Sequence, residues 1–211
     1  MIFISLEGID GSGKTTIAKI VKDKLVQKGF DVLLTREPGG EPISEKIREL
    51  VLDPENSEMT AWTEALLYIA SRKQHLDQVI IPALKKGTIV ISDRFMDSTT
   101  VYQGFARKLG ITDVDEIQNI VIGPAIPDIT LFFDISPEEA KVRLDLRNSG
   151  SDRLEAEADE FHEKVYQGYR MLISENSNRI KVIDARKAVD VISRQAIYLI
   201  EELLEERKAS Q

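Results

Sequence analysis

The chain has 211 residues, of which 42% are hydrophobic and 30% are charged, and it has a formal net charge of -8 at pH 7 and no cysteine. This length and hydrophobicity predict one folded domain over residues 1–211 and argue against long disorder. The acidic balance argues against a chain that mainly coats nucleic acid or an anionic membrane surface. The lack of cysteine excludes a disulfide framework, a thiolate zinc site and a cysteine nucleophile.

The opening residues 1–6 are mostly apolar, but no basic region precedes them and they meet Glu7 too soon to form the core of a signal peptide. No stretch of the chain approaches the roughly 18 uninterrupted apolar residues of a membrane-spanning helix. We therefore expect a soluble, cytoplasmic protein that has neither a nucleic-acid partner nor a membrane partner.

Short apolar runs rich in β-branched residues alternate with longer amphipathic stretches. Buried strands are predicted at residues 2–6, 32–35, 88–92, 129–133 and 181–183. Helices are predicted at residues 15–28, 62–86, 112–122 and 189–207. This alternation is typical of βαβ units, so we expect an α/β fold in three layers, with a five-stranded parallel sheet flanked by helices on both faces.

The most informative spacing is Gly8-Ile9-Asp10-Gly11-Ser12-Gly13-Lys14-Thr15, which fits the P-loop pattern of two glycines around four residues, then lysine and a hydroxyl. The backbone N–H groups of such a loop turn toward phosphate oxygens, and the following helix N-terminus favours the same anion. Lys14 would reach the β- and γ-phosphates of a nucleoside triphosphate, and the Thr15 hydroxyl would coordinate Mg²⁺. The alternative is a glycine turn that only joins a strand to a helix. The position after a predicted strand and before a predicted helix disfavours it.

Asp93 comes directly after the predicted strand 88–92, where P-loop proteins place the Walker B carboxylate near magnesium. We therefore predict a metal site formed by Thr15 and Asp93. Asp134, after the next strand, is a weaker candidate for the same role. A strand-terminal aspartate is often only structural, but Arg94 follows Asp93 directly, and that pairing favours chemistry. The Asn-Lys-x-Asp element of guanine-specific GTPases does not occur in the chain.

Further segments resemble one family, the bacterial-type thymidylate kinases. They are Thr35-Arg36-Glu37-Pro38-Gly39-Gly40, Thr63-Glu64-Ala65-Leu66-Leu67-Tyr68 leading to Ala70-Ser71-Arg72, Asp93-Arg94-Phe95 and Tyr102-Gln103-Gly104. With the P-loop they cover nearly the whole chain, and the set is specific because other P-loop nucleotide kinases share only the first motif and a scattered arginine. The resemblance implies the P-loop kinase fold, ATP as the phosphoryl donor, Mg²⁺ as cofactor and a homodimer.

The resemblance also implies an acceptor site for dTMP. Asp10 matches the acidic P-loop residue that reads the deoxyribose 3′-hydroxyl, and Arg94 matches the arginine that bridges the acceptor phosphate and the donor γ-phosphate. Arg72 and Tyr68 match the residues that hydrogen-bond to thymine and stack on it. The whole set implied for dTMP is Asp10, Glu37, Arg48, Tyr68, Arg72, Arg94, Thr99, Tyr102 and Gln103.

The resemblance implies roles at the base edge, the sugar and the phosphate for the remaining members of that set. Thr99 and Gln103 fall where the family contacts the base edge, and Tyr102 falls where a ring crowds the 2′ position and disfavours ribonucleotides. The resemblance also implies that Glu37 and Arg48 line the acceptor pocket near magnesium and phosphate. Thr99 is often serine in the family, a change that keeps the hydroxyl.

Residues 143–155 match the lid that closes over the donor. This P-loop has no arginine of its own, so the resemblance implies that a lid arginine, Arg147 or Arg153, reaches the transferring phosphoryl group alongside Lys14 and Arg94. Adenine contacts are poorly marked, with Arg143 and the turn at residues 185–186 as candidates. The predicted ATP-binding set is Gly8, Ile9, Asp10, Gly11, Ser12, Gly13, Lys14, Thr15, Thr16 and Arg143.

We therefore expect ATP-dependent phosphorylation of dTMP to dTDP by direct in-line transfer, a step in dTTP biosynthesis. Two alternatives stay open: another nucleotide or deoxynucleoside kinase on the same scaffold, and a P-loop switch or partitioning protein that binds nucleotide to control a partner. Arg72, Arg94 and Gln103 speak against a switch, because a switch needs no nucleobase pocket. With six arginines assigned to one cleft or its lid, we also expect a locally basic cleft in an otherwise acidic protein.

Overall fold

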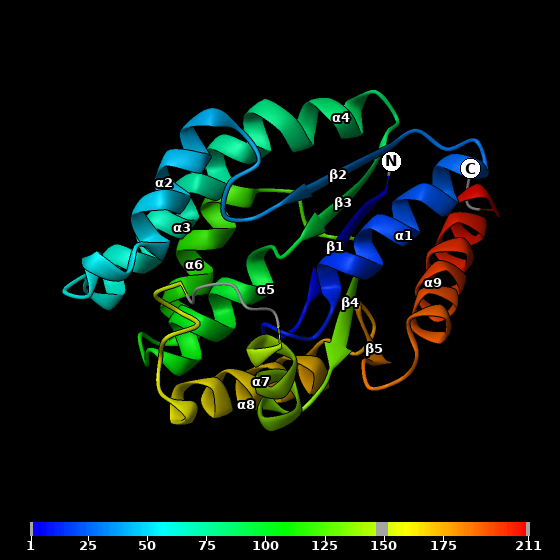
Figure 1. Cartoon of the computed structure of the whole chain (residues 1–211). Coiled ribbons are helices and arrows are strands. Elements are labelled where there is room, and N and C mark those ends of the chain that lie inside the picture. Colours follow the sequence, from blue (N-terminus) through cyan, green and yellow to red (C-terminus); the bar gives the residue numbers. More distant parts are fainter. Residues whose placement is uncertain (1, 147–151, 210–211) are drawn as a thin grey trace.

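The computed structural model describes residues 2–146 and 152–209. Five parallel strands form one sheet in the order β2-β3-β1-β4-β5 (Figure 1). The strands are β1 (Phe3–Glu7), β2 (Val32–Arg36), β3 (Ile89–Asp93), β4 (Ile129–Asp134) and β5 (Ile180–Asp184). All five lie within a residue or two of the predicted ranges, which confirms the predicted α/β fold.

The helices cover both faces of the sheet (Figure 1). They are α1 (Lys14–Gln27), α2 (Pro42–Leu52), α3 (Ala61–His75), α4 (Ile81–Lys85), α5 (Met96–Thr99), α6 (Ile111–Ile122), α7 (Pro137–Asp145), α8 (Asp159–Glu175) and α9 (Val189–Ala209). Two π-helical turns, η2 (Leu76–Ile80) and η3 (Thr100–Ala106), continue α3 and α5, and a short 3-10 turn, η1 (Pro54–Asn56), follows α2.

Successive strand residues point to opposite faces, so each face of the sheet has its own apolar packing. Ile4 and Ile91 pack with the cluster that includes the buried side chains of α1 and α9. Phe3 and Val90 pack with a smaller cluster, to which η2 contributes two residues. This two-sided burial explains why the strands are near-continuous apolar runs.

Four helices, α2, α5, α7 and α8, were not predicted from the sequence. Two of them carry start signals. At α2, the Glu41 side chain accepts from the N–H groups of Ile43 and Ser44 and Pro42 takes the first helical position. At α7, Ser136 and Glu139 form a reciprocal capping box. The predicted helix 62–86 is divided into α3, η2 and α4.

The register brings the carboxyl ends of the strands to one edge of the sheet. Asp93 lies opposite Leu6 on β1 and Arg36 on β2, and Asp134 lies opposite Asp184 on β5. Ligands of open parallel sheets bind outside this edge. No described helix combines the length and the apolar character needed to cross a membrane.

Candidate active site

The P-loop joins β1 to α1, as the spacing predicted. Lys14 opens α1 and its side chain is buried and folded back over the loop, where Nζ donates to Gly8 O and Ile9 O, both at 2.9 Å, and to Ser12 Oγ at 3.3 Å. Thr15 and Thr16 follow on the exposed first turn. The loop therefore holds a cation among backbone dipoles, which is the arrangement that binds phosphate.

Two charged residues of the loop, Lys14 and Asp10, have pKa values far from their ordinary ones. Burial and the nearby charge of Arg94 lower the pKa of Lys14 to about 8. Burial alone would raise the pKa of Asp10, but the charges of Arg94 and Lys14 outweigh it and hold that pKa at about 2. At neutral pH Lys14 is therefore charged and Asp10 is ionised.

Thr15 and Asp93 lie together, as predicted. The Thr15 hydroxyl donates to Asp93 Oδ2 at 2.5 Å. Asp134, the weaker candidate, lies elsewhere at the sheet edge and accepts from the Tyr166 hydroxyl at 2.9 Å and from Arg170 at 3.3 Å, both on α8. Asp93 is thus the carboxylate that the fold brings to the P-loop.

Arg94 joins the P-loop to the neighbouring cleft. Its Nη2 donates to Asp10 Oδ1 at 2.7 Å and to the Tyr102 hydroxyl at 3.3 Å, and its guanidinium lies over the Tyr102 ring at 5.2 Å. The residue has a φ of 72°, in the left-handed region that non-glycine residues seldom adopt and that costs about 1–3 kcal/mol. The fold maintains this strained backbone at a position where one side chain reaches both sites.

Sequence reasoning missed Glu7, which supports this strained turn. Glu7 ends β1 and is fully buried, and it accepts from Phe95 N at 2.7 Å, from Ser98 Oγ at 2.6 Å and from the Tyr169 hydroxyl at 2.8 Å. The signal available in the sequence was a carboxylate at the end of an otherwise apolar strand, directly before the P-loop.

Beside Arg94 lies a cleft that encloses about 560 Å³ of space, part of which is open to solvent. All nine residues predicted to bind the acceptor line it. The described lining residues are Asp10, Glu37, Pro38, Arg48, Leu52, Tyr68, Arg72, Arg94, Phe95, Ser98, Thr99, Tyr102, Gln103, Asp152 and Leu154. Six separate segments of sequence therefore converge on one hollow.

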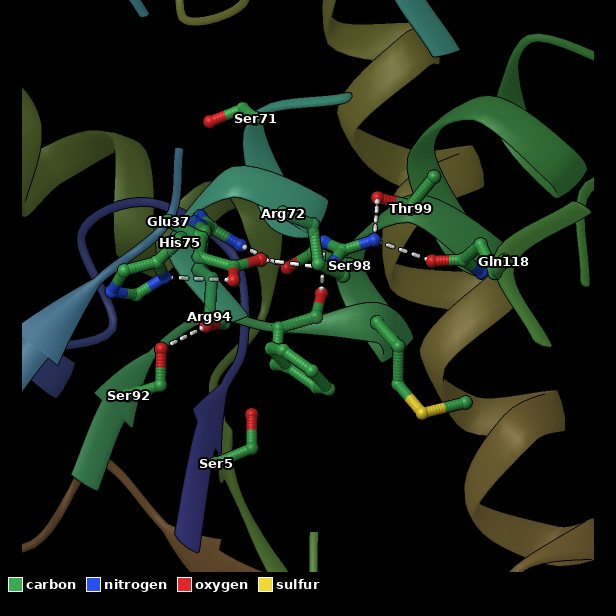
Figure 2. Close-up of polar contacts among 12 residues, drawn as sticks. Ser5, Glu37, Ser71, Arg72, His75, Ser92, Arg94, Ser98, Thr99 and Gln118 are labelled. Atoms are coloured by element: carbon green, nitrogen blue, oxygen red, sulfur yellow. Dashed lines mark hydrogen bonds and ion pairs between the residues drawn. The ribbon is translucent and has the colours of Figure 1, made fainter. Parts of the chain in front are cut away.

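Arg72, in this wall, makes four hydrogen bonds through its side chain, as many as Arg94 does. Its Nε donates to Glu37 Oε2 at 2.7 Å, Nη1 donates to Thr99 Oγ1 at 3.1 Å and to Gln118 Oε1 at 2.5 Å, and Nη2 donates to Phe95 O at 3.0 Å. Figure 2 shows the guanidinium between Glu37 on one side and Thr99 and Gln118 on the other. Four of its five N–H groups are thereby fixed by the protein.

The Glu37 carboxylate contacts two buried side chains, Arg72 and His75. Its second oxygen lies 3.0 Å from His75 Nδ1, and the other ring nitrogen of His75 lies 2.7 Å from Thr35 Oγ1 (Figure 2 shows the Glu37 contact). His75 and Gln118 were missed from the sequence, because each reads as an ordinary polar residue on a helix. Only the fold reveals that each holds a residue of the cleft wall, Gln118 through Arg72 and His75 through Glu37.

The remaining cleft residues differ in how many of their polar groups are already hydrogen-bonded to the protein. Arg48 donates to the Pro38 carbonyl at 3.0 Å, so its positive charge faces no carboxylate within hydrogen-bond distance in the described structure. Gln103 donates from Nε2 to Glu64 Oε1 at 2.8 Å. Tyr68 is buried against the cleft, and burial raises its pKa well above the ordinary value, so it stays neutral.

The lid arginines do not all lie where the resemblance implied. Arg147 lies outside the described residues. Arg153 does not extend to the P-loop: its Nη2 donates to Glu64 Oε2 at 2.5 Å and its Nε donates to Val51 O at 2.8 Å. The physical reason is that a buried carboxylate, Glu64, attracts this cation to the acceptor side.

Arg143, the candidate adenine contact, lies on α7 and donates from Nη2 to Ala185 O at 2.8 Å. Arg143 therefore contacts the turn at residues 185–186, which the sequence also suggested as an adenine contact.

The prediction of a locally basic cleft is wrong for the wall as it stands. Its three arginines are accompanied by three carboxylates, and Arg94 pairs with Asp10 as Arg72 pairs with Glu37. Burying a guanidinium requires a compensating charge. Arg48, which donates to a carbonyl and not to a carboxylate, is the arginine of the wall that could bind an anionic ligand.

Comparison with known proteins agrees with this geometry. A family model described as Thymidylate kinase matches residues 6–196. Thymidylate kinase of Mycoplasma capricolum subsp. capricolum is 54% identical over 208 residues, which are 98% of each chain, and that of Mesoplasma florum is 49% identical over 204 residues, 97% of each. A crystal structure of thymidylate kinase from Ehrlichia chaffeensis matches with a TM-score of 0.75 at 30% identity, covering 95% of this chain and 98% of that one. This chain belongs to the thymidylate kinase family.

Proposed function

We propose that the protein transfers the γ-phosphoryl group of ATP to dTMP, giving ADP and dTDP, a step in dTTP biosynthesis. The observation that carries the proposal is the Arg94–Asp10 pair, which joins a P-loop to a cleft lined by a nucleobase-sized set of polar and aromatic groups. Two nucleotides bound on either side of Arg94 would place their phosphates against the same cation. Direct in-line transfer needs this positioning and no covalent enzyme intermediate.

The donor would lie on the P-loop, with its phosphates on the backbone N–H groups of residues 8–16 and on Lys14. Lys14 now bonds two loop carbonyls and a hydroxyl, and phosphate oxygens are stronger acceptors for an ammonium group than these. Arg143, at the turn after β5, supports adenine binding on that side.

The acceptor would lie in the cleft with its base against Arg72, Thr99 and Gln103 and its ring against Tyr68. Arg72 retains one N–H on Nη2, which suits a carbonyl oxygen of thymine. Arg48 and Arg94 suit the phosphate. The Tyr102 ring next to Arg94 supports a crowded 2′ position and hence a deoxyribose.

Mg²⁺ fits the residues at the end of the P-loop. Thr15 Oγ1 and Asp93 Oδ2 converge at 2.5 Å, and magnesium prefers oxygen ligands, of which the protein often supplies only one or two while nucleotide phosphates and water supply the rest. Bound there, the ion would neutralise charge on the β- and γ-phosphates. Thr15 and Asp93 would hold it.

The catalytic role that we propose for a lid arginine rests on the resemblance to the family. For Arg153 to reach the transferring group it must leave Glu64, so its catalytic role requires a different arrangement of residues 152–155. Arg147 is the alternative lid cation.

We further propose a cytoplasmic homodimer. On the adjoining helices α3 and α6, Trp62, Leu66 and Ile120 expose apolar surface, and Ile120 is 84% accessible. A second copy packed on these helices would remove that surface from water.

The test of the reaction is a panel of acceptors assayed with ATP and Mg²⁺. We expect dTMP to be phosphorylated far faster than dUMP, dCMP or thymidine. Equal rates with another acceptor would replace the proposal by a different kinase on this scaffold. Hydrolysis of ATP at the same slow rate with and without every acceptor would indicate a switch protein instead.

A further inference from the structure

Glu64 lies behind the cleft wall and is not among the described residues that line the cleft. It is on α3, almost fully buried, and accepts from Gln103 Nε2 at 2.8 Å through one oxygen and from Arg153 Nη2 at 2.5 Å through the other. Arg107 adds a contact of 3.2 Å to each oxygen. Both oxygens of this carboxylate are therefore engaged, one by an amide and both by cations.

A carboxylate in these surroundings acts only as an acceptor. Burial pushes the pKa of Glu64 upward, but the hydrogen bonds from Gln103, Arg107 and Arg153 and the charge of Arg107 bring it below its ordinary value. An ionised carboxylate has no proton to donate. The Gln103 amide must consequently present its NH₂ group to Glu64 and direct its carbonyl oxygen elsewhere.

That carbonyl oxygen is accessible from the cleft. Every fully buried side-chain nitrogen or oxygen of the described residues has a hydrogen-bond partner. Gln103 Oε1 has no partner among the described residues, although the residue as a whole is buried. The oxygen is thus reachable from outside, and the hollow that Gln103 lines is this cleft.

Arg72 is fixed in the opposite sense. Its partners Glu37, Thr99, Gln118 and Phe95 O take four N–H groups and leave one on Nη2 (Figure 2). The wall therefore carries one fixed donor and one fixed acceptor.

We propose that Glu64 is a positioning residue which makes Gln103 a fixed acceptor and so selects a pyrimidine that has a ring N–H beside a carbonyl. A pyrimidine with an amino group beside an unprotonated ring nitrogen meets donor against donor at Arg72 and acceptor against acceptor at Gln103. The inference rests on the proposed function, because it requires a pyrimidine nucleotide in the cleft.

The decisive variant is Glu64→Gln. Arg153 Nη2 and Arg107 Nη2 both donate to the Oε2 site, whereas the Oε1 site receives only the 3.2 Å contact from Arg107 Nε beside Gln103. The new amide therefore keeps its oxygen at the Oε2 site, gives up that single contact from Arg107 Nε and directs its NH₂ group toward Gln103. Gln103 then turns its own carbonyl to that group and its NH₂ to the cleft. We expect the ratio of kcat/KM for dTMP over dCMP to fall by about tenfold or more, since specificity of this kind depends on paired buried polar groups.

Three companion variants make the result specific. Glu64→Asp keeps the charge, and so the fold, but draws the carboxylate back from Gln103, and we expect the ratio to fall again. The double variant Glu64→Gln/Gln103→Glu places at position 103 a carboxylate that can only accept, and it should restore the preference for dTMP. Glu157→Gln removes another carboxylate that pairs with Arg107, at 2.5 Å, without touching Gln103, and should leave the ratio unchanged.

The ratio separates positioning from a general structural defect, because a loosened fold lowers both kcat/KM values together. If Glu64→Gln does not fold, Glu64→Asp decides. A ratio within threefold of the parent value in the variant that folds overturns the role of Glu64 while leaving the dTMP kinase assignment intact. Failure of the parent protein to prefer dTMP overturns the proposed function itself.

Discussion

At the scale of single residues, the site is a set of charges close enough to set one another's protonation. Arg94 holds the pKa of Asp10 low, and with burial it holds the pKa of Lys14 at about 8. The same guanidinium thus lowers the pKa of the P-loop lysine and pairs with a carboxylate of the cleft wall. Adding a phosphate to this group would compensate positive charge that burial now disfavours.

The lowered pKa of Lys14 predicts pH-dependent ATP binding. Below about pH 8 the amino group is charged and attracts phosphate, whereas above that pH it loses its proton and the attraction. We expect the Kd for ATP, measured without acceptor by titration calorimetry, to rise as the pH passes through about 8. In Lys14→Ala the Kd should be high throughout, and turnover should fall by about 10²-fold or more. A flat profile in the parent protein would contradict this assignment.

Arg72 predicts a combined loss of stability and binding. Arg72→Ala leaves Glu37 as a buried carboxylate without its arginine partner, and breaking a buried pair costs about 3–5 kcal/mol of the free energy of unfolding. The KM for dTMP should rise as well. Combining Arg72→Ala with Glu37→Gln should recover part of the stability, measured by urea unfolding, without restoring the KM. Recovery of both together would show that Arg72 acts on the fold alone.

At the scale of elements, the P-loop is built against α7 as well as between β1 and α1. Gly11 has a φ of 82°, and a Cβ at this position would lie 2.5 Å from the Ala140 carbonyl oxygen on α7. The loop can approach the helix this closely only because the residue has no side chain.

Gly11→Ala should therefore displace the loop from α7. We expect a lower melting temperature and a loss of ATP affinity. Gly29→Ala is the matched control: its φ is 88°, but a Cβ there would have no heavy atom within 4 Å, so it carries only the strain of about 1–2 kcal/mol and should bind ATP normally. Equal ATP affinity in the two variants would exclude the close approach as the cause.

At the scale of the whole molecule, both the excess of acidic residues and the exposed apolar side chains of α3 and α6 lie outside the cleft. The cleft wall has as many carboxylates as arginines among its described residues, so the net charge of -8 belongs to the remainder of the chain. The apolar side chains of α3 and α6 lie outside the cleft. Association through those helices would leave the cleft open to substrates.

Ile120→Glu tests the dimer. A charge at the most exposed of these apolar positions opposes burial in an interface, so sedimentation should show the parent protein as a dimer and the variant as a monomer or a weakened dimer. Val142→Glu, an exposed apolar position on α7, is the control and should sediment like the parent. A monomeric parent would refute the dimer at once.

The fold and much of the site could be predicted because their signals are local. Five apolar runs gave the strands, since a strand buried on both faces must be apolar throughout. Helices α2 and α7 were harder because both are short, 11 and 9 residues, and their start signals span only a few residues. The nine residues predicted to bind the acceptor were assigned from the family resemblance, and the structure brings all nine to one cleft.

The sequence by itself determined the P-loop and the strand-terminal Asp93, because each is a contiguous pattern at the end of a buried strand. The segments that form the cleft wall were predicted from their resemblance to one family. Only the tertiary structure decided which groups pair inside that wall. Arg72 meets Glu37 across 35 positions and Arg153 meets Glu64 across 89. Such pairs follow from the need to compensate every buried charge with the nearest partner in space. No local spacing encodes that partner, so the positions of Glu64, Gln118 and Arg153 appear only once the chain is folded.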